Sequence, residues 1–126
     1  MGRRQVSTTM ARPEQPVDIE HLNRYTGGDR VLNEEILQLF ATQCREMMAR
    51  LESLAAGEAD AKSWRETTHT LKGAARGIGA FALGNAAAEA EKTGGERPNV
   101  LPAVEQLKST SAAVYLFIEQ ILEDQH

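Results

Sequence analysis

The chain has 126 residues, with 14 Lys+Arg against 18 Asp+Glu and a formal charge of −4. This length suits one domain with a single core, and a net acidic chain with one Trp and two Tyr is a poor candidate for binding a nucleic-acid backbone. The single cysteine, Cys44, excludes an internal disulfide and a cysteine zinc cluster, and no apolar run approaches the length of a membrane span.

The first 16 residues are polar, contain Pro13 and Pro16, and show no apolar period. We therefore expect a flexible tail over residues 1–16 and one domain over residues 17–126. The beginning of the chain has no apolar segment typical of a secretory signal, so we expect a soluble cytoplasmic protein. Aromatic residues are only 5% and β-branched residues are sparse, which favours helices over sheets.

The first two predicted helices are bounded by aspartate caps and glycine stops. A short helix is expected from Asp18 to Tyr25, ending at Gly27-Gly28, and Asp29 is placed as the cap of a second helix that runs to about Ala56. At ~100° per residue the second helix has one apolar face. That face carries Ile36, Leu37, Phe40, Cys44, Met47, Leu51 and Leu54.

Three further helices complete the prediction. The third follows Asp60 and reaches about Gly77, and the fourth runs from about Ala80 to Lys92. The fourth has a small-residue stripe that allows close helix packing, formed by Leu83, Ala86, Ala87 and Ala90. The fifth is expected to be capped by Asn99, with Pro102 in its first turn. Its apolar stripe is Val100, Leu107, Val114, Ile118 and Ile121. We predict an all-α fold, an antiparallel up-and-down four-helix bundle with a short extra N-terminal helix.

The third helix carries a histidine on the side opposite its apolar stripe. Trp64, Leu71 and Ile78 recur every seven residues and fall opposite His69, so we expect His69 to face outward. The residues within about 60° of His69 are four cations and a glycine: Lys62, Arg65, Lys72, Gly73 and Arg76. An ordinary solvated helix face that happens to hold a histidine is the alternative interpretation.

Two features favour a reactive histidine over that alternative. A glycine inside a helix costs about 1 kcal/mol relative to alanine, and Gly73 lies one turn after His69 on the same face, where it leaves the imidazole open to a large partner. The clustered cations suit an anionic group or an acidic partner surface. Neutral imidazole is a nucleophile near neutral pH, and a phosphoryl group on it would lie among Lys72, Arg76 and Arg65.

The string HTLKGAARGIGA, from His69 to Ala80, resembles the signature of the histidine-containing phosphotransfer (HPt) domain of two-component phosphorelays. The resemblance extends over about residues 18 to 122. Its further matching residues are Gly27, Gly28, Asp29, Ile36, Leu39, Phe40, Leu83, Ala86, Ala87, Ala90 and Glu91. Ala86 and Ala90 stand where leucines are usual in the family, which affects the expected helix spacing and not the chemistry.

The resemblance implies a role for each residue of the motif. His69 would be the phosphoacceptor at Nε2, Lys72 the cation nearest to the phosphoryl group, and Gly73 the space for docking. Glu91 matches a glutamate that, in the chemotaxis-kinase members, is hydrogen-bonded to the histidine Nδ1 and would fix the tautomer. An ordinary surface carboxylate is the alternative for Glu91. The role of Arg76, which would offset charge on the phosphoryl oxygens beside Lys72, depends on the helical wheel alone.

The implied function is a phosphorelay intermediate, in which His69 accepts a phosphoryl group from a receiver phospho-aspartate and passes it to another receiver aspartate. Lys62 and Arg65 are expected to contribute to partner docking. We expect receiver domains and a hybrid or sensor histidine kinase as partners, no nucleic acid or membrane, and a monomer. No cofactor is expected on this chain, because Mg²⁺ would come with the receiver. The chain has no Gly-rich nucleotide-binding loop, so we expect a phosphocarrier without kinase activity of its own.

Two other functions and several weaker site candidates remain. A helical binding module could regulate a receiver or kinase without carrying phosphate, and the dimerising histidine domain of a sensor kinase would need a proline shortly after the histidine, which is absent.

His21 and His126 have no partner histidine at metal-ligand spacing, so a zinc site is not expected. Cys44 falls on the buried stripe and is expected to be a small core residue.

Overall fold

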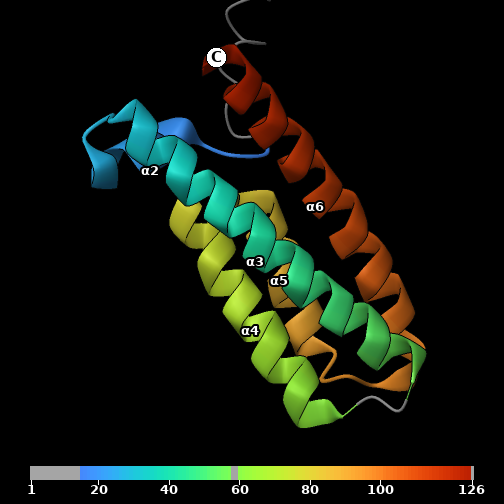
Figure 1. Cartoon of the computed structure of the whole chain (residues 1–126). Helices are drawn as coiled ribbons and strands as arrows, with labels where there is room; N and C mark the ends of the chain where they lie inside the picture. The colour runs from blue at the N-terminus through green and yellow to red at the C-terminus, as the bar shows by residue number, and fades with distance from the viewer. Residues whose placement is uncertain (1–14, 58–59, 126) are drawn as a thin grey trace, which may run out of the picture.

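The computed structural model describes residues 15–57 and 60–125, and within them the chain forms helices and no strand. The helices are α2 (Ile19–Thr26), α3 (Arg30–Ala56), α4 (Ala61–Ile78), α5 (Phe81–Lys92) and α6 (Arg97–Gln125). Figure 1 shows α3 to α6 running alternately in opposite directions, with α2 at one end beside the beginning of α3. Each of the four long helices packs against two of the others in the order α3, α4, α5, α6 and back to α3. The predicted antiparallel bundle with a short extra helix is confirmed.

Three aspartates begin helices as predicted. The side chains of Asp18, Asp29 and Asp60 each accept a hydrogen bond from a backbone N–H two or three residues later, at 3.1–3.3 Å. Such a cap satisfies one of the donors that a helix leaves without an intrahelical partner, and its loss costs about 1 kcal/mol. A flexible tail was expected over residues 1–16, and its first 14 residues lie outside the described part of the chain.

The beginning of α6 differs from the prediction. The helix begins at Arg97, three residues before the Val100 start that an Asn99 cap implies, and Asn99 is not its cap. The carbonyl of Glu96 accepts the backbone N–H groups of Asn99 at 2.9 Å and Val100 at 3.1 Å. Pro102 consequently lies in the second turn and not in the first.

The predicted apolar stripes meet in one core. The stripe of α5 is buried over its whole length, and Cys44 and Trp64 are fully buried on α3 and α4. Ile36, Leu54 and Ile121 are half-buried at the edge of this core. The short side chains of α5 allow it to pack closely between α4 and α6, which places the outer edge of α5 beside the outer face of α4.

A glycine turn sets the direction of α5 relative to α4. Gly79 ends α4 in the left-handed region with φ +91°, and the N–H of Ala80 donates to the carbonyl of Ala75 at 2.8 Å. The carbonyl of Gly79 accepts the N–H of Asp18 at 2.9 Å, so the beginning of α2 is attached to this turn. A Cβ at Gly79 would lie 2.6 Å from the Asp18 carbonyl oxygen, which only a glycine avoids. The chain therefore reverses tightly here, and α5 returns alongside α4.

Candidate functional site

His69 lies in the middle of α4 on its outer face. Its side chain is 68% exposed, whereas Trp64 and Leu71 on the opposite face are fully buried. The predicted orientation of the helix, with the apolar stripe inward and the imidazole outward, is therefore confirmed. An exposed ring of this kind is open to a second macromolecule as well as to small molecules.

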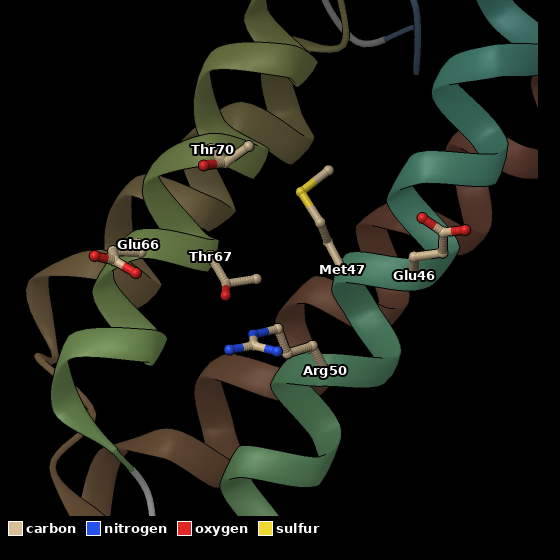
Figure 2. A pocket seen from close by; sticks show the side chains of 6 residues that line it. All are labelled: Glu46, Met47, Arg50, Glu66, Thr67 and Thr70. Atoms are coloured by element: carbon tan, nitrogen blue, oxygen red, sulfur yellow. The ribbon is translucent and has the colours of Figure 1, made fainter.

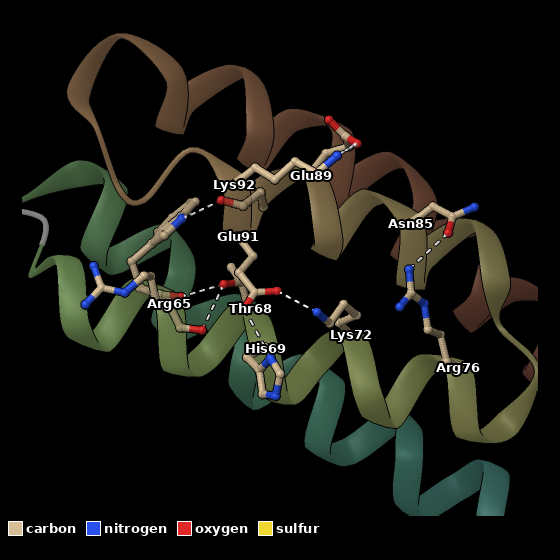
Figure 3. A network of polar contacts seen from close by, with 11 residues as sticks. Arg65, Thr68, His69, Lys72, Arg76, Asn85, Glu89, Glu91 and Lys92 are labelled. Carbon is tan, nitrogen blue, oxygen red and sulfur yellow. Dashed lines mark hydrogen bonds and ion pairs between the residues drawn. The ribbon is translucent and has the colours of Figure 1, made fainter.

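Glu91 on α5 holds one nitrogen of the His69 ring. Its Oε2 lies 3.1 Å from His69 Nδ1, although the two residues are 22 positions apart in the chain. Figure 3 shows the carboxylate between the imidazole and Lys72. An ionised carboxylate is only an acceptor, so Nδ1 must carry the proton and donate it to this hydrogen bond. The lone pair of the ring is then on Nε2, on the solvent side.

Lys72 shares the same carboxylate. Its Nζ donates to Glu91 Oε1 at 2.8 Å, and the two side chains are 23% and 27% exposed. The hydrogen bond from Lys72 lowers the pKa of Glu91 most, the bond from His69 lowers it further, and partial burial opposes both. Glu91 therefore stays ionised at neutral pH, and its two oxygens keep separate partners.

The backbone beside Glu91 is fixed by the core. The buried indole of Trp64 donates from Nε1 to the carbonyl of Ala90 at 2.8 Å, and the hydroxyl of Thr93 donates to the same carbonyl at 2.7 Å. These bonds anchor α5 to α4 at the residue before Glu91. The sequence placed Trp64 in the apolar stripe but contained no signal that its N–H would cross to α5.

Arg76 extends over α5 and not toward His69. Its Nη2 donates to Asn85 Oδ1 at 3.4 Å, and a Cβ built on Gly84 would lie 2.7 Å from Arg76 Cγ. The helical wheel indicated the direction of the Cα–Cβ bond correctly, but the guanidinium lies on the flank of α5, two turns from His69 (Figure 3). Gly84 was not predicted as part of the site, although a glycine inside a helix is the same signal that identified Gly73.

The remaining cations do not enclose the imidazole. Lys62 and Arg65 are exposed on the first half of α4, two turns and one turn before His69. In Figure 3 the guanidinium of Arg65 points away from His69. The groups nearest to Nδ1 are the Glu91 carboxylate and, on its other oxygen, the Lys72 ammonium. Of the four cations predicted on this face, Lys72 shares a hydrogen-bond partner with His69, and the other three lie one or two turns away along the helix.

Two glycines follow His69 on α4 and leave the surface of the helix without side chains at their positions. Gly73 and Gly77 are exposed, and a Cβ built on either would meet no heavy atom within 4 Å. Neither glycine is required by packing or by a positive φ. This leaves a low, open strip on the face that carries His69, as the sequence predicted for Gly73.

A groove lies on the other flank of His69, between α3 and α4. It has a volume of about 400 Å³, and in Figure 2 Met47 and Arg50 extend from α3 toward α4. Its lining residues are Glu46, Met47, Arg50, Glu66, Thr67 and Thr70. Large apolar side chains are exposed farther along α3 and on α2, among them Tyr25, Val31, Leu32 and Leu39. Mixed charged and apolar surfaces of this kind suit a protein partner.

The described residues contain no group of three or more His, Cys, Asp or Glu that could hold a metal ion. The ring of His21 packs edge-on against Tyr25 and Phe81, with centroid distances of 5.3 Å and 5.1 Å. His126 lies outside the described residues. None of the described helices combines the length and the apolar character that crossing a bilayer requires.

Comparison with known proteins identifies one family. A model of the Hpt domain matches residues 35–123, a stretch that begins in α3, ends in α6 and includes His69, Lys72 and Glu91. No curated protein and no solved structure matches the chain.

Proposed function

Because the chain belongs to the Hpt domain family of two-component phosphorelays, we propose that His69 is its phosphorylated residue and that receiver domains are its donor and acceptor. The observation that carries this proposal is the exposed imidazole whose Nδ1 is bonded to Glu91, which leaves Nε2 as the nucleophile. The family membership supports histidine phosphotransfer in general, and the geometry supports His69 as the site.

The transfer step needs one nucleophile and one leaving group. The lone pair of His69 Nε2 attacks the phosphorus of an aspartyl phosphate on the donor receiver, and a P–N bond forms as the P–O bond to the aspartate breaks. The electron pair of that bond goes to the aspartate carboxylate. Nε2 carries no proton, so none has to leave, and the ring becomes a phosphorylated imidazolium with its proton still on Nδ1. Attack by the carboxylate of a second receiver reverses these changes.

Glu91 is proposed to act on the charge and the tautomer of the ring. Its carboxylate holds the proton on Nδ1 before transfer and balances the positive ring after it. Lys72 holds that carboxylate in place in the unloaded chain through its 2.8 Å bond to Oε1. We therefore assign Lys72 a positioning role, in place of the direct phosphoryl contact that the family resemblance implied.

Docking is proposed to take place on the face of α4 that carries the open strip. Gly73 leaves room beside the imidazole, and the groove along α3 offers Met47 and Arg50 to a partner. Mg²⁺ would be held by the acidic pocket of the receiver. We further propose that the chain is a monomeric cytoplasmic phosphocarrier without kinase activity of its own.

The test is incubation of the chain with phosphorylated receiver domains from the same genome, followed by measurement of label on each partner. We expect at least one receiver to lose label to the wild-type chain and none to label His69→Gln. The matched controls are His21→Gln and His126→Gln, which should keep the label. Label on His69→Gln would overturn the assignment, and receivers that bind without transferring label would favour the regulatory binding module instead.

A further inference from the structure

We propose that Arg76 is a partner-recognition residue, whose guanidinium is held along α5 to bind a carboxylate on the receiver that docks at His69. This inference rests on the proposed function, since it names one contact of the same docking event. It replaces the phosphoryl contact that the helical wheel suggested for Arg76.

Gly84 makes room for this arginine. Gly84 is buried within α5, where glycine is the least favourable residue after proline. The three atoms nearest to a Cβ built there all belong to the Arg76 side chain: Cγ at 2.7 Å, Nε at 3.4 Å and Cδ at 3.6 Å. A larger residue would push the arginine off α5. The glycine is therefore explained by the placement of Arg76.

The guanidinium has donors left for a partner. It has five N–H donors, of which one contacts Asn85 Oδ1 at 3.4 Å, and Arg76 is exposed. Within the described residues, no acidic side chain forms an ion pair with Arg76. The planar fork of an arginine matches the two oxygens of a carboxylate, and this geometry is stronger and more selective than a lysine contact. An acidic side chain on the partner is thus the chemistry that fits.

Arg76 lies within reach of any protein that docks at His69. Seven residues separate them along α4, which is about 10.5 Å at about 1.5 Å per residue, and both leave the helix in nearly the same direction. A typical interface covers about 800 Å² on each partner, equivalent to a disc of about 16 Å radius. Gly73 and Gly77 lie between the two residues and carry no side chain that would hold the partner away.

The experiment separates recognition of the partner from contact with the phosphoryl group. The receiver that loses most label to the wild-type chain in the transfer test described under the proposed function is used as the partner. It is combined with wild type, Arg76→Ala, Arg76→Lys and Gly84→Ala. Lys108→Ala, which removes a half-exposed cation from α6, is the matched control. The KM for the receiver is measured at low and high salt. Phosphoramidate labelling and the lifetime of the phosphohistidine are measured without any partner.

We expect Arg76→Ala to raise the KM about fivefold at low salt and to weaken its salt dependence, while phosphoramidate labelling and lifetime stay at wild-type values. Arg76→Lys should recover part of the loss, and Gly84→Ala should show a loss although the arginine is still present. A change in lifetime or phosphoramidate labelling would overturn the inference by placing Arg76 at the phosphoryl group. An unchanged KM would overturn it by limiting Arg76 to packing on α5. If phosphoramidate failed to label wild-type His69, the proposed function itself would fail, which is a separate result.

Discussion

Removing Lys72 and Glu91 singly and together tests whether the lysine acts through the carboxylate. In the structure the Lys72 ammonium contacts Glu91 Oε1, while His69 Nδ1 contacts Oε2 of the same group. If the role of Lys72 is to hold Glu91, then Lys72→Ala should slow transfer in the wild-type chain and have no effect once Glu91→Ala is present. If Lys72 contacted the phosphoryl group directly, the two substitutions would act independently, and the factors by which they lower the transfer rate would multiply.

The magnitude follows from the exposure of the groups. A buried hydrogen bond to a charged group contributes about 1.5–3 kcal/mol. The His69 side chain is 68% exposed, so solvent screening reduces this to about 1 kcal/mol. Because about 1.4 kcal/mol corresponds to a factor of about ten, Glu91→Ala should lower the rate of transfer about fivefold. Lys72→Ala leaves the carboxylate in place but less well held, and we expect about a twofold loss.

The assay is single-turnover transfer from a phosphorylated receiver at saturating concentration, where docking no longer limits the rate. The tautomer of His69 is followed in parallel by ¹⁵N NMR of the ring, which reports the position of the proton directly. We expect the double variant to transfer at the rate of Glu91→Ala alone. An equal factor for Lys72→Ala in both backgrounds would refute the positioning role, and a wild-type rate for Glu91→Ala would make Glu91 an ordinary surface carboxylate.

Three further outcomes are expected. Gly73→Leu should keep the helicity and raise the melting temperature, because the space above it is open and leucine is the better helix former, but should slow transfer from a receiver; an unchanged rate would show that the glycine does not serve access. The difference in melting temperature between wild type and Glu91→Gln should be full above the ordinary pKa of 4.5 and should vanish as the pH falls through the lowered pKa of Glu91; a difference that persists at pH ~2 would contradict the ion pair. Leu71→Ala should cost about 2–5 kcal/mol in urea unfolding followed by circular dichroism, because the side chain is fully buried, and a loss below about 1 kcal/mol would contradict its place in the core.

Local signals predicted the bundle because they act within one turn of helix. Asp29 and Asp60 cap the helices expected from them, since their carboxylates need only a backbone N–H two or three residues away. Asn99 is not the cap because its own N–H and that of Val100 already donate to the carbonyl of Glu96, and Pro98, which has no N–H, is tolerated in the first turn that begins at Arg97. A preference of about 1 kcal/mol for one cap residue is too small to fix which of two nearby residues begins the helix.

The candidate site was predicted in position, and the family resemblance also implied the contact between Glu91 and His69 Nδ1 that the structure shows, but the other contacts were not predicted. A helical wheel gives the direction in which a side chain leaves the helix, which was sufficient for His69 and Gly73. It does not give the place where a long side chain ends, so the bond from Lys72 to Glu91 and the path of Arg76 along α5 did not follow from it. The contact between Glu91 and His69 depends on how far α5 is displaced along α4, and that displacement is set by the turn at Gly79 and by packing across the core.

The indole bond from Trp64 to the carbonyl of Ala90 has a consequence for observing this molecule. Trp64 is the sole tryptophan of the chain, and it occupies the back of the helix whose front carries the imidazole. Its emission therefore comes from a single known place, one peptide unit away from the carboxylate that touches the ring. We expect this emission to report the spacing between α4 and α5, and a change in emission on addition of a phosphorylated receiver would show whether loading of His69 is transmitted to the core.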